Sequence, residues 1–369
     1  MKIIETGILN PAGEGRRAVA SRPSVVLLDD GTLLAAYRVG STKDSEDETV
    51  ELRSSTDLGR TWSQPSSPFA ATVGGIRGSL PLVCLTRREG ERLLAVGMWV
   101  NREAFPGQPL FNAQTEGCLP MAILVADSSD RGRSWSGWRV VPIPPDIGPP
   151  SLTSPILRFA DGSLALSVET NKNYLDNSPW RQRVVYFRSF DEGKSWSRPE
   201  AISEDPTQRL FYWDQRAAVA PDGRLVTFSW TYDRQKNVYL NIQRNLSSDR
   251  GKSWRGFDDL GFSDQPSRPA ILPDGRVVVA WVDRFGSSSI RARLADGLEA
   301  PFSAATEVVL YEHGKQAASS QDTGELLADM GQWSYGLPYA EALPDGEVLV
   351  AYYAGTNTRM GIHWARLKA

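Results

Sequence analysis

One short pattern, Ser-x-Asp-x-Gly-x-Thr/Ser-Trp, occurs four times in the chain. The copies span residues 55–62, 128–135, 189–196 and 247–254. In such a turn the aspartate can accept hydrogen bonds from nearby backbone, the glycine supplies a positive φ, and the tryptophan can pack between neighbouring sheets. Each copy follows a strand-like run, such as residues 184–187. A hairpin turn repeated four times predicts an array of similar β units.

A second repeat, in a different register, counts those units. An apolar run turns at an acidic residue followed by glycine and returns as another apolar run, which is typical of a tight antiparallel hairpin. The six turns are Asp30-Gly31, Glu89-Gly90, Asp161-Gly162, Asp222-Gly223, Asp274-Gly275 and Asp345-Gly346. The chain has no amphipathic helical stretch of convincing length. We therefore predict an all-β, six-bladed β-propeller, a single domain over residues 1–369, whose last strand includes residues 361–366 and closes against the N-terminal part.

The four-fold pattern resembles the Asp-box of the sialidase-like β-propellers. In that family the boxes lie at the periphery of the blades, so their residues are expected to be structural. Ser-Arg-Pro at residues 21–23 looks like the segment that opens sialidase domains, whose arginine is one of three that bind the substrate carboxylate. The resemblance implies a propeller of sialidase type that acts on a glycan carrying an acidic sugar.

Composition excludes several other classes. The formal net charge of −3 leaves no basic stripe, so nucleic acid is not an expected partner. The two histidines, His313 and His363, lie in no cluster with zinc-ligand spacing, and no metal or cofactor is expected. The N-terminal segment, MKIIETGILNPAGEGRR, lacks an apolar core, and no run could span a membrane. We expect a cytoplasmic protein as the sequence stands, or a secreted or periplasmic one if a leader was removed.

Propeller geometry predicts which residues share a site. The first strand of each blade lines the channel and the second runs antiparallel beside it, so the start of one and the end of the other meet on one face. The candidates for substrate binding at these positions are Arg22, Arg38, Trp99, Glu169, Arg216 and Arg268. Arginines, carboxylates and aromatic rings together suit a sugar that carries a carboxylate. The alternative is a polar surface whose side chains merely pair with one another.

Two of the arginines occur in a repeated tripeptide. Ser-Arg-Pro recurs at residues 267–269, so we expect Arg22 and Arg268 to point into one pocket and share a carboxylate. Where the resemblance places the second of the three arginines, the chain has Trp230. Arg216, Arg38 or Arg284 could substitute for it in space.

The resemblance also assigns catalytic residues. Asp44 falls where the family keeps its general acid/base, with Glu46 and Asp47 as alternatives. Asp214 lies near the position of the glutamate that activates the nucleophile. Tyr335 resembles the tyrosine nucleophile, with a spacing about two residues off.

In the implied mechanism, Tyr335 attacks the anomeric carbon with Asp214 as its base. Asp44 protonates the leaving oxygen and later activates water, which gives retention. We expect Asp44 to keep its proton readily, because burial and nearby carboxylates both penalise ionisation.

Three functions fit these observations. The first is a retaining exo-glycosidase of sialidase type, which removes terminal sialic acid or a related acidic sugar. The second is a sialidase-like propeller that acts on a uronic-acid polysaccharide by hydrolysis or β-elimination. The third is a glycan-binding propeller without catalysis. Fold resemblance does not choose among them.

Overall fold

A computed structural model of the chain describes residues 1–314 and 330–369. In this part, regular structure consists of β-strands and four single turns of 3-10 helix, at Gly15–Arg17, Pro145–Ile147, Ala304–Thr306 and Met330–Gln332. Within the same residues, no helix is long and apolar enough to cross a membrane. The all-β prediction is confirmed.

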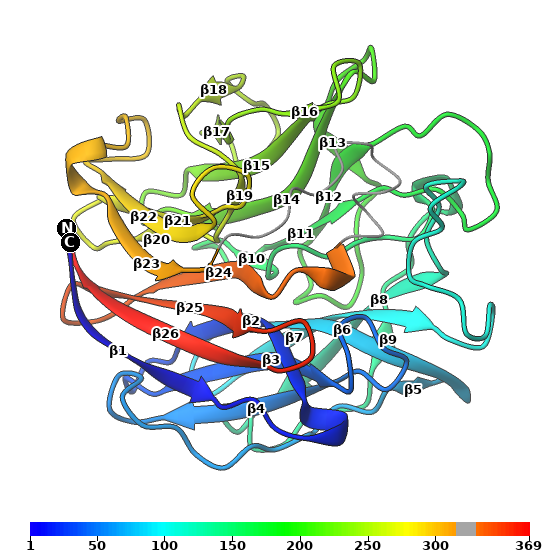
Figure 1. Cartoon of the computed structure of the whole chain (residues 1–369), viewed down its shortest axis with the longest axis horizontal. Coiled ribbons are helices and arrows are strands. Elements are labelled where there is room, and N and C mark those ends of the chain that lie inside the picture. Colours follow the sequence, from blue (N-terminus) through cyan, green and yellow to red (C-terminus); the bar gives the residue numbers. More distant parts are fainter. Residues whose placement is uncertain (315–329) are drawn as a thin grey trace.

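Hydrogen bonds group the strands into five sheets (Figure 1). The largest contains β1 (Lys2–Asn10), β2 (Val19–Leu27), β3 (Leu33–Gly40), β4 (Thr49–Ser55), β24 (Tyr335–Ala342), β25 (Glu347–Gly355) and β26 (Met360–Lys368). The second contains β5 (Thr72–Val73), β6 (Ile76–Arg87), β7 (Leu93–Asn101), β8 (Met121–Ser128) and β9 (Arg139–Val140). The third contains β10 (Leu157–Arg158), β11 (Leu164–Glu169), β12 (Arg183–Ser189) and β13 (Glu200–Glu204).

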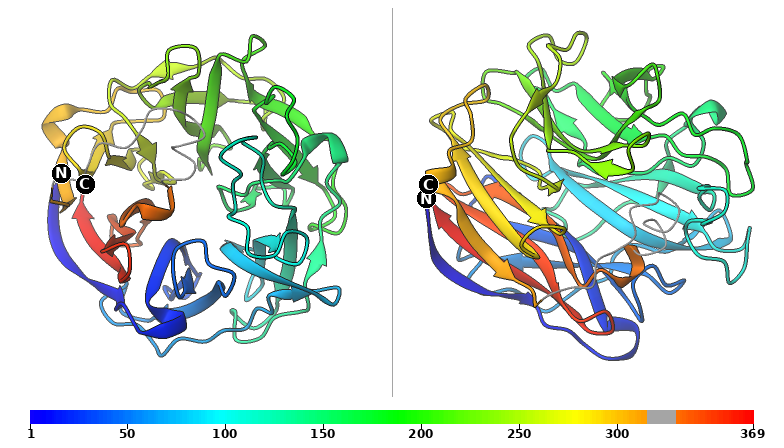
Figure 2. Two further views of the ribbon diagram at one scale, coloured as in Figure 1. Left: turned by 45° about the vertical axis from the view of Figure 1, so that its right-hand side comes forward. Right: turned by 45° about the horizontal axis from the view of Figure 1, so that its top comes forward.

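The remaining two sheets complete the arrangement. One contains β14 (Leu210–Val219), β15 (Leu225–Asp233), β16 (Val238–Tyr239), β17 (Gln243–Ser247) and β18 (Asp258–Asp259). The other contains β19 (Gln265–Pro266), β20 (Ala270–Ile271), β21 (Val277–Asp283), β22 (Ser289–Ala295) and β23 (Val308–Glu312). The sheets stand around a common centre (Figure 2).

The six predicted hairpins are confirmed. The strand pairs β2–β3, β6–β7, β10–β11, β14–β15, β20–β21 and β24–β25 are all antiparallel. The glycine of each predicted turn has a positive φ, as at Gly31 (84°) and Gly223 (85°), a conformation that glycine adopts without steric cost.

The four repeated turns follow the third main strand of their units, β4, β8, β12 and β17, and their contacts are structural. In the first copy, the Gly59 N–H donates to Ser55 Oγ at 2.8 Å and the Thr61 N–H donates to Asp57 Oδ1 at 2.9 Å. The Trp62 indole N–H donates to the Gly59 carbonyl at 2.9 Å. These bonds hold the turn together, and none of the four turns supplies a residue to the pocket described below.

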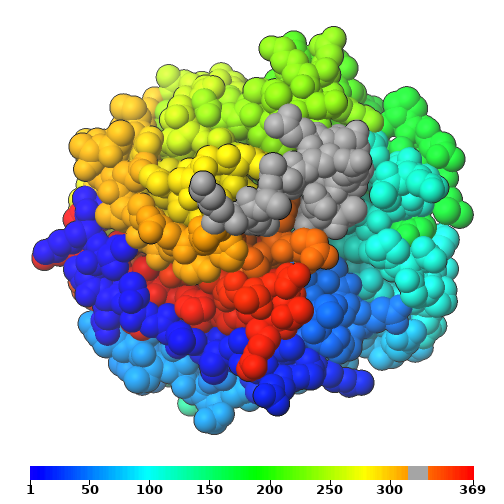
Figure 3. All heavy atoms as spheres, viewed as in Figure 1, coloured from blue at the N-terminus to red at the C-terminus, as the bar shows by residue number. Residues whose placement is uncertain are grey.

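The two chain ends close the arrangement. β1 pairs antiparallel with β26 from Lys2–Lys368 to Asn10–Ile362, as the sequence predicts for the last strand. The two ends lie side by side (Figure 1), and the N-terminal (blue) and C-terminal (red) segments adjoin at the surface (Figure 3). A single parallel pair, Val19–Met360, joins β2 to β26. Apolar side chains fill the space between neighbouring sheets, as between Leu94 and Leu164. Burial between sheets leaves the centre free for polar groups.

Candidate active site

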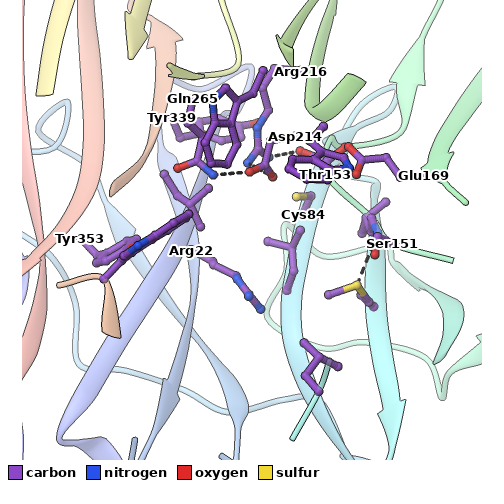
Figure 4. Close-up of a pocket in the computed structure, with 18 of the residues that line it drawn as sticks. Arg22, Cys84, Ser151, Thr153, Glu169, Asp214, Arg216, Gln265, Tyr339 and Tyr353 are labelled. Atoms are coloured by element: carbon purple, nitrogen blue, oxygen red, sulfur yellow. Dashed lines mark hydrogen bonds and ion pairs between the residues drawn. The ribbon is translucent and has the colours of Figure 1, made fainter. Parts of the chain in front are cut away.

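A pocket of about 1190 Å³, solvent at its mouth included, opens at one end of the centre. The charged residues that line it are Arg22, Lys43, Glu169, Asp214 and Arg216. The aromatic ones are Phe111, Trp180, Trp213, Trp230, Trp333, Tyr339 and Tyr353. Arg22 and Tyr353 come from one side, and Glu169 from the other (Figure 4). Rings beside a few charged groups are typical of a sugar-binding pocket.

Three of the lining side chains project from β-bulges. Arg22, Asp214 and Leu337 have φ of 51°, 46° and 43°. Each falls where the strand register shifts, in β2, β14 and β24. Each also lies nine residues before the glycine of its own hairpin turn. Bulges re-aim side chains, so in these three units the same position delivers a residue to the pocket.

One wall holds Asp44 between two arginines. Its Oδ1 accepts from Arg22 Nη2 at 3.2 Å and from Arg38 Nη1 at 3.0 Å. Arg38 is buried and also pairs with Glu48. Burial alone would raise the pKa of Asp44, but the charges of Arg22, Arg38 and Lys43 hold it well below its ordinary value. The expectation that Asp44 keeps its proton is therefore wrong, because the groups around it are cations.

Lys43 precedes Asp44 on the same loop and reaches toward β25. Its Nζ donates to the Trp333 carbonyl at 3.1 Å and to Tyr353 Oη at 3.2 Å. Burial lowers the pKa of Lys43; Asp44 opposes this, and the charges of Arg284 and other arginines add to the lowering. The pocket therefore places a lysine amine against a tyrosine hydroxyl.

The opposite wall carries two neighbouring carboxyls. Glu169, the last residue of β11, is 8% exposed, and its Oε1 accepts from the Gln215 N–H at 3.1 Å. Burial and the charge of Asp214 raise the pKa of Glu169 to about 8. Asp214 accepts from Arg216 Nη2 at 3.3 Å and from Gln265 Nε2. At neutral pH Glu169 is thus a buried proton donor beside a hydrogen-bonded aspartate.

The sequence was compared with protein-family models and with curated proteins. No protein-family model matches the chain. A curated sialidase from Micromonospora viridifaciens is 24% identical over 363 residues, which cover 91% of this chain and 50% of that relative. The chain thus spans about half the length of this relative.

Solved structures match over nearly the whole chain. A protein of unknown function from Dyadobacter fermentans has a TM-score of 0.75 at 21% identity, covering 99% of this chain and 98% of its own. Penicillium chrysogenum α-L-arabinanase, complexed with arabinobiose, has a TM-score of 0.69 at 17% identity, covering 100% of this chain and 99% of its own. The Ruminococcus gnavus intramolecular trans-sialidase, complexed with oseltamivir carboxylate, has a TM-score of 0.63 at 14% identity, covering 98% of this chain and 96% of its own. This chain has the fold of the sialidase superfamily.

Within this sialidase fold, Tyr335 does not line the pocket. Its side chain is fully buried between the β20–β23 and β24–β26 segments, and its ring stacks on His313 at 4.7 Å. The pocket position of β24 is taken by Leu337, two residues further along. The two-residue offset in spacing therefore separates a core tyrosine from the bulge position.

The structure does not bring Arg22 and Arg268 together, so the expectation of a shared pocket is wrong. Arg268 pairs with Glu341 at 2.6 Å and lines a second cavity. It lies seven residues before its turn glycine, whereas Arg22 lies nine before. Two residues correspond to about 7 Å along a strand, so the repeated tripeptide is out of register.

The other candidates divide between the pocket and its surroundings. Arg216 and Glu169 line the pocket, whereas Arg38 supports Asp44 from beneath. Trp99 packs between sheets, and its indole N–H donates to the Ala71 carbonyl at 2.7 Å. Sequence reasoning missed Gln265. Counting back nine residues from Gly275 gives Pro266, the neighbour of Gln265 in β19, so the turn glycine would have pointed to this strand.

Proposed function

We propose that the chain is a glycoside hydrolase that cleaves a glycan in this pocket, with Glu169 as proton donor and Asp214 as the second carboxylate. The observation that carries the proposal is a buried glutamate whose pKa is raised to about 8 beside Asp214. A pair of carboxyl groups, one of which donates a proton, is what most glycosidases use. The aromatic lining and the shared fold support a carbohydrate as the substrate.

In the proposed reaction, Glu169 gives up one proton and later regains one, while Asp214 forms and then releases a bond to the sugar. The Glu169 carboxyl gives its proton to the glycosidic oxygen while the bond from that oxygen to the anomeric carbon breaks. For the retention that the family resemblance implies, Asp214 attacks the same carbon and forms a glycosyl ester. Glu169, now a carboxylate, takes a proton from water, whose oxygen displaces Asp214. Proton NMR of the first-formed anomer tests retention.

Three positions favour this carboxylate pair over the tyrosine mechanism. Leu337 occupies the bulge position of β24, and a leucine offers no attacking oxygen. Trp230 stands where the second of three arginines was expected, and Arg268 faces the second cavity. We therefore test a sialoside as one of several candidate substrates and do not propose sialic acid as the preferred one.

We also infer six blades. The seven-stranded sheet would count as two, β2–β4 and β24–β26 with β1, because only the pair Val19–Met360 joins them. The six confirmed hairpins support this division, with one hairpin in each blade. An experimental structure with five or seven repeats of this unit would contradict it.

The test is a panel of 4-nitrophenyl glycosides that includes arabinofuranosides, sialosides and uronides. For any substrate cleaved, Glu169→Gln should remove turnover of the corresponding glycoside with a poor leaving group and spare the nitrophenyl compound. Asp214→Asn should remove both. Glu91→Gln, on the outer surface, is the matched control and should retain both activities.

The outcomes separate the candidate functions. Binding of glycans without cleavage would mean that the chain is a binding module. An unsaturated sugar product, detected by its ultraviolet absorbance, would indicate β-elimination rather than hydrolysis. Activity that survives Asp214→Asn would contradict the carboxylate pair.

A further inference from the structure

Gln265 links Asp214 to the neighbouring sheet. It belongs to β19, and its amide nitrogen Nε2 donates to Asp214 Oδ2 on β14 (Figure 4). The other oxygen of this carboxyl, Oδ1, accepts from Arg216 Nη2 at 3.3 Å. The carboxyl is thus held from both sides, by an amide group and by a guanidinium group.

The backbone around Gln265 is fixed to β21. The Asp264 N–H donates to the Val282 carbonyl at 2.9 Å. The Ser267 N–H donates to the Ala280 carbonyl at 2.7 Å. Gln265 itself is 3% exposed and lines the pocket. A buried side chain on a fixed strand has little freedom to rotate, so the amide can hold its partner in one orientation.

The donor that Gln265 provides is neutral, and this distinguishes Asp214 from the other aspartate of the site. Asp44 accepts from two arginines, and although burial alone would raise its pKa, nearby cations hold it below the ordinary value. An amide donates a hydrogen bond to a carboxylate but brings no positive charge. The charge of Asp214 therefore still acts on Glu169, whose pKa burial and this charge raise to about 8.

Among the charged groups, Asp214 and Arg216 act most on Glu169. Arg216, also on β14, lowers the pKa of Glu169, but by less than Asp214 raises it. The other charged or titratable groups around the pair, in the described part of the chain, are Arg22, Lys43, Cys84, Tyr339 and Tyr353 of the pocket lining, Tyr239, which lies in the field of Asp214, and Asp264, which precedes Gln265. A positive charge introduced at position 265 would join Arg216 in offsetting Asp214.

We propose that Gln265 is a positioning residue of the carboxyl pair, whose neutral amide fixes the Asp214 carboxylate beside Glu169 without adding a positive charge. This proposal rests on the proposed function, since it concerns how the same two groups are prepared for proton donation and attack. Gln265 acts through Asp214 and not on the substrate itself. An arginine or lysine at this position would hold the aspartate equally well but would weaken its effect on Glu169.

Titration of Glu169 tests the electrostatic part of the proposal without requiring turnover. Carbon-13 NMR of the full chain, labelled at the glutamate carboxyls, would follow this group, and its signal is identified by its absence from Glu169→Gln. In the unaltered chain the midpoint should lie near pH 8. Gln265→Lys places an ammonium group beside Asp214, so the midpoint should fall by about one pH unit or more.

Gln265→Leu separates the hydrogen bond from the charge. Leucine brings neither a donor nor a charge, so Glu169 should still titrate well above its ordinary value of 4.5. For any glycoside that the chain cleaves, kcat should nevertheless fall about tenfold with little change in KM, because Asp214 is no longer held in place. A side chain that only joined two sheets would affect stability but neither the midpoint nor this split between kcat and KM.

Gln64 provides matched controls. It is exposed, follows the first repeated turn and lies outside the pocket lining, so Gln64→Lys and Gln64→Leu make the same two changes elsewhere. Both variants should keep the midpoint and the turnover of the unaltered chain. Thermal unfolding followed by circular dichroism would show that each variant is folded. If Gln265→Lys is unfolded, Gln265→Glu carries the titration, because it is nearly the size of glutamine and its added negative charge should move the midpoint to higher pH.

The proposal is wrong if the midpoint of Glu169 is unchanged in Gln265→Lys, or in Gln265→Glu where that variant replaces it. It is also wrong if Gln265→Leu turns over a substrate as fast as the unaltered chain. A midpoint that falls in Gln265→Lys, without cleavage of any glycoside, would support the role of Gln265 while contradicting the proposed hydrolase. Cleavage that depends on Glu169, with one midpoint in all variants, would do the reverse.

Discussion

At the residue scale, Asp44 and Glu169 show how neighbours decide the state of a buried carboxyl. Asp44 lies among Arg22, Arg38 and Lys43, which hold its pKa low, whereas Glu169 lies beside Asp214, which helps to raise its pKa. Of these two carboxyls, Glu169 is therefore the one that keeps its proton at neutral pH, and it is the proton donor that we propose. Spacing along the chain pointed to Asp44, but spacing carries no information on charges delivered by other strands.

The pH dependence of turnover follows from the raised pKa of Glu169. The group is protonated below about pH 8 and loses its proton above it. For a glycoside with a poor leaving group, kcat/KM should fall as pH rises through this value. Activity measured from pH 5 to 10 would show the falling limb. The idea fails if Glu169→Gln keeps residual activity with the same falling limb.

The stability that Asp44 contributes should depend on pH in the opposite sense. Its folded pKa lies below the ordinary value of 3.8, so the contribution is present above that value and is lost as pH falls below it. Asp44→Asn should lower the free energy of unfolding by about 1–3 kcal/mol at pH 7, and by less at pH 3. Urea unfolding at both pH values measures the difference. Asp29→Asn, at an exposed aspartate, should change little, and an equal loss at both pH values for Asp44→Asn would contradict the ion-pair account.

At the scale of elements, the turns could be predicted from the sequence, whereas the residue of each strand that faces the pocket could not. The hairpin turns and the four repeated turns depend on a few adjacent residues, such as Ser55, Asp57 and Gly59, and these behave as the sequence indicates. Placing a side chain in the pocket depends on a bulge whose position must be counted from the turn. For this reason Arg268 and Tyr335 were assigned to a site that they do not reach.

One repeated turn offers a test of that local chemistry. Asp57 accepts bonds from the Thr61 N–H, the Thr61 hydroxyl and Ser55 Oγ, which outweigh burial and lower its pKa to about 2. Asp57→Ala should lower the free energy of unfolding by about 1 kcal/mol without changing activity. Thermal unfolding would measure the loss, with Asp29→Ala as the control. A loss of activity with unchanged stability would mean that the turn has a functional role.

At the scale of the whole molecule, closure between the chain ends sets the architecture. β1 runs along β26 over its full length, and Leu9 and Asn10 are buried at the end of that strand. The contact is close: a Cβ on Gly7 would lie 2.5 Å from Trp364 Cζ2. The sequence predicted this closure from the count of six hairpin turns with only four copies of the repeated turn.

A substitution at Gly7 should loosen the closure selectively. Gly7→Val places a branched side chain against the indole ring of Trp364, so overpacking should cost about 1–3 kcal/mol. Thr6→Val, whose side chain points to solvent on the same strand, should cost much less. Chemical denaturation of both variants tests this. Equal stability of the two would mean that β1 contributes little to the closed form.

The pairing of β1 with β26 also sets an order of events during synthesis. β1 finds its partner only when the residues of β26, Met360–Lys368, have emerged from the ribosome. Contacts so distant along the chain form late, because the entropy of closing a long loop must be overcome first. Until then, the hairpins in between can pair and pack while the first strand has no partner. This sheet therefore closes only after β26 has been synthesised, when residues more than 350 positions apart become neighbours.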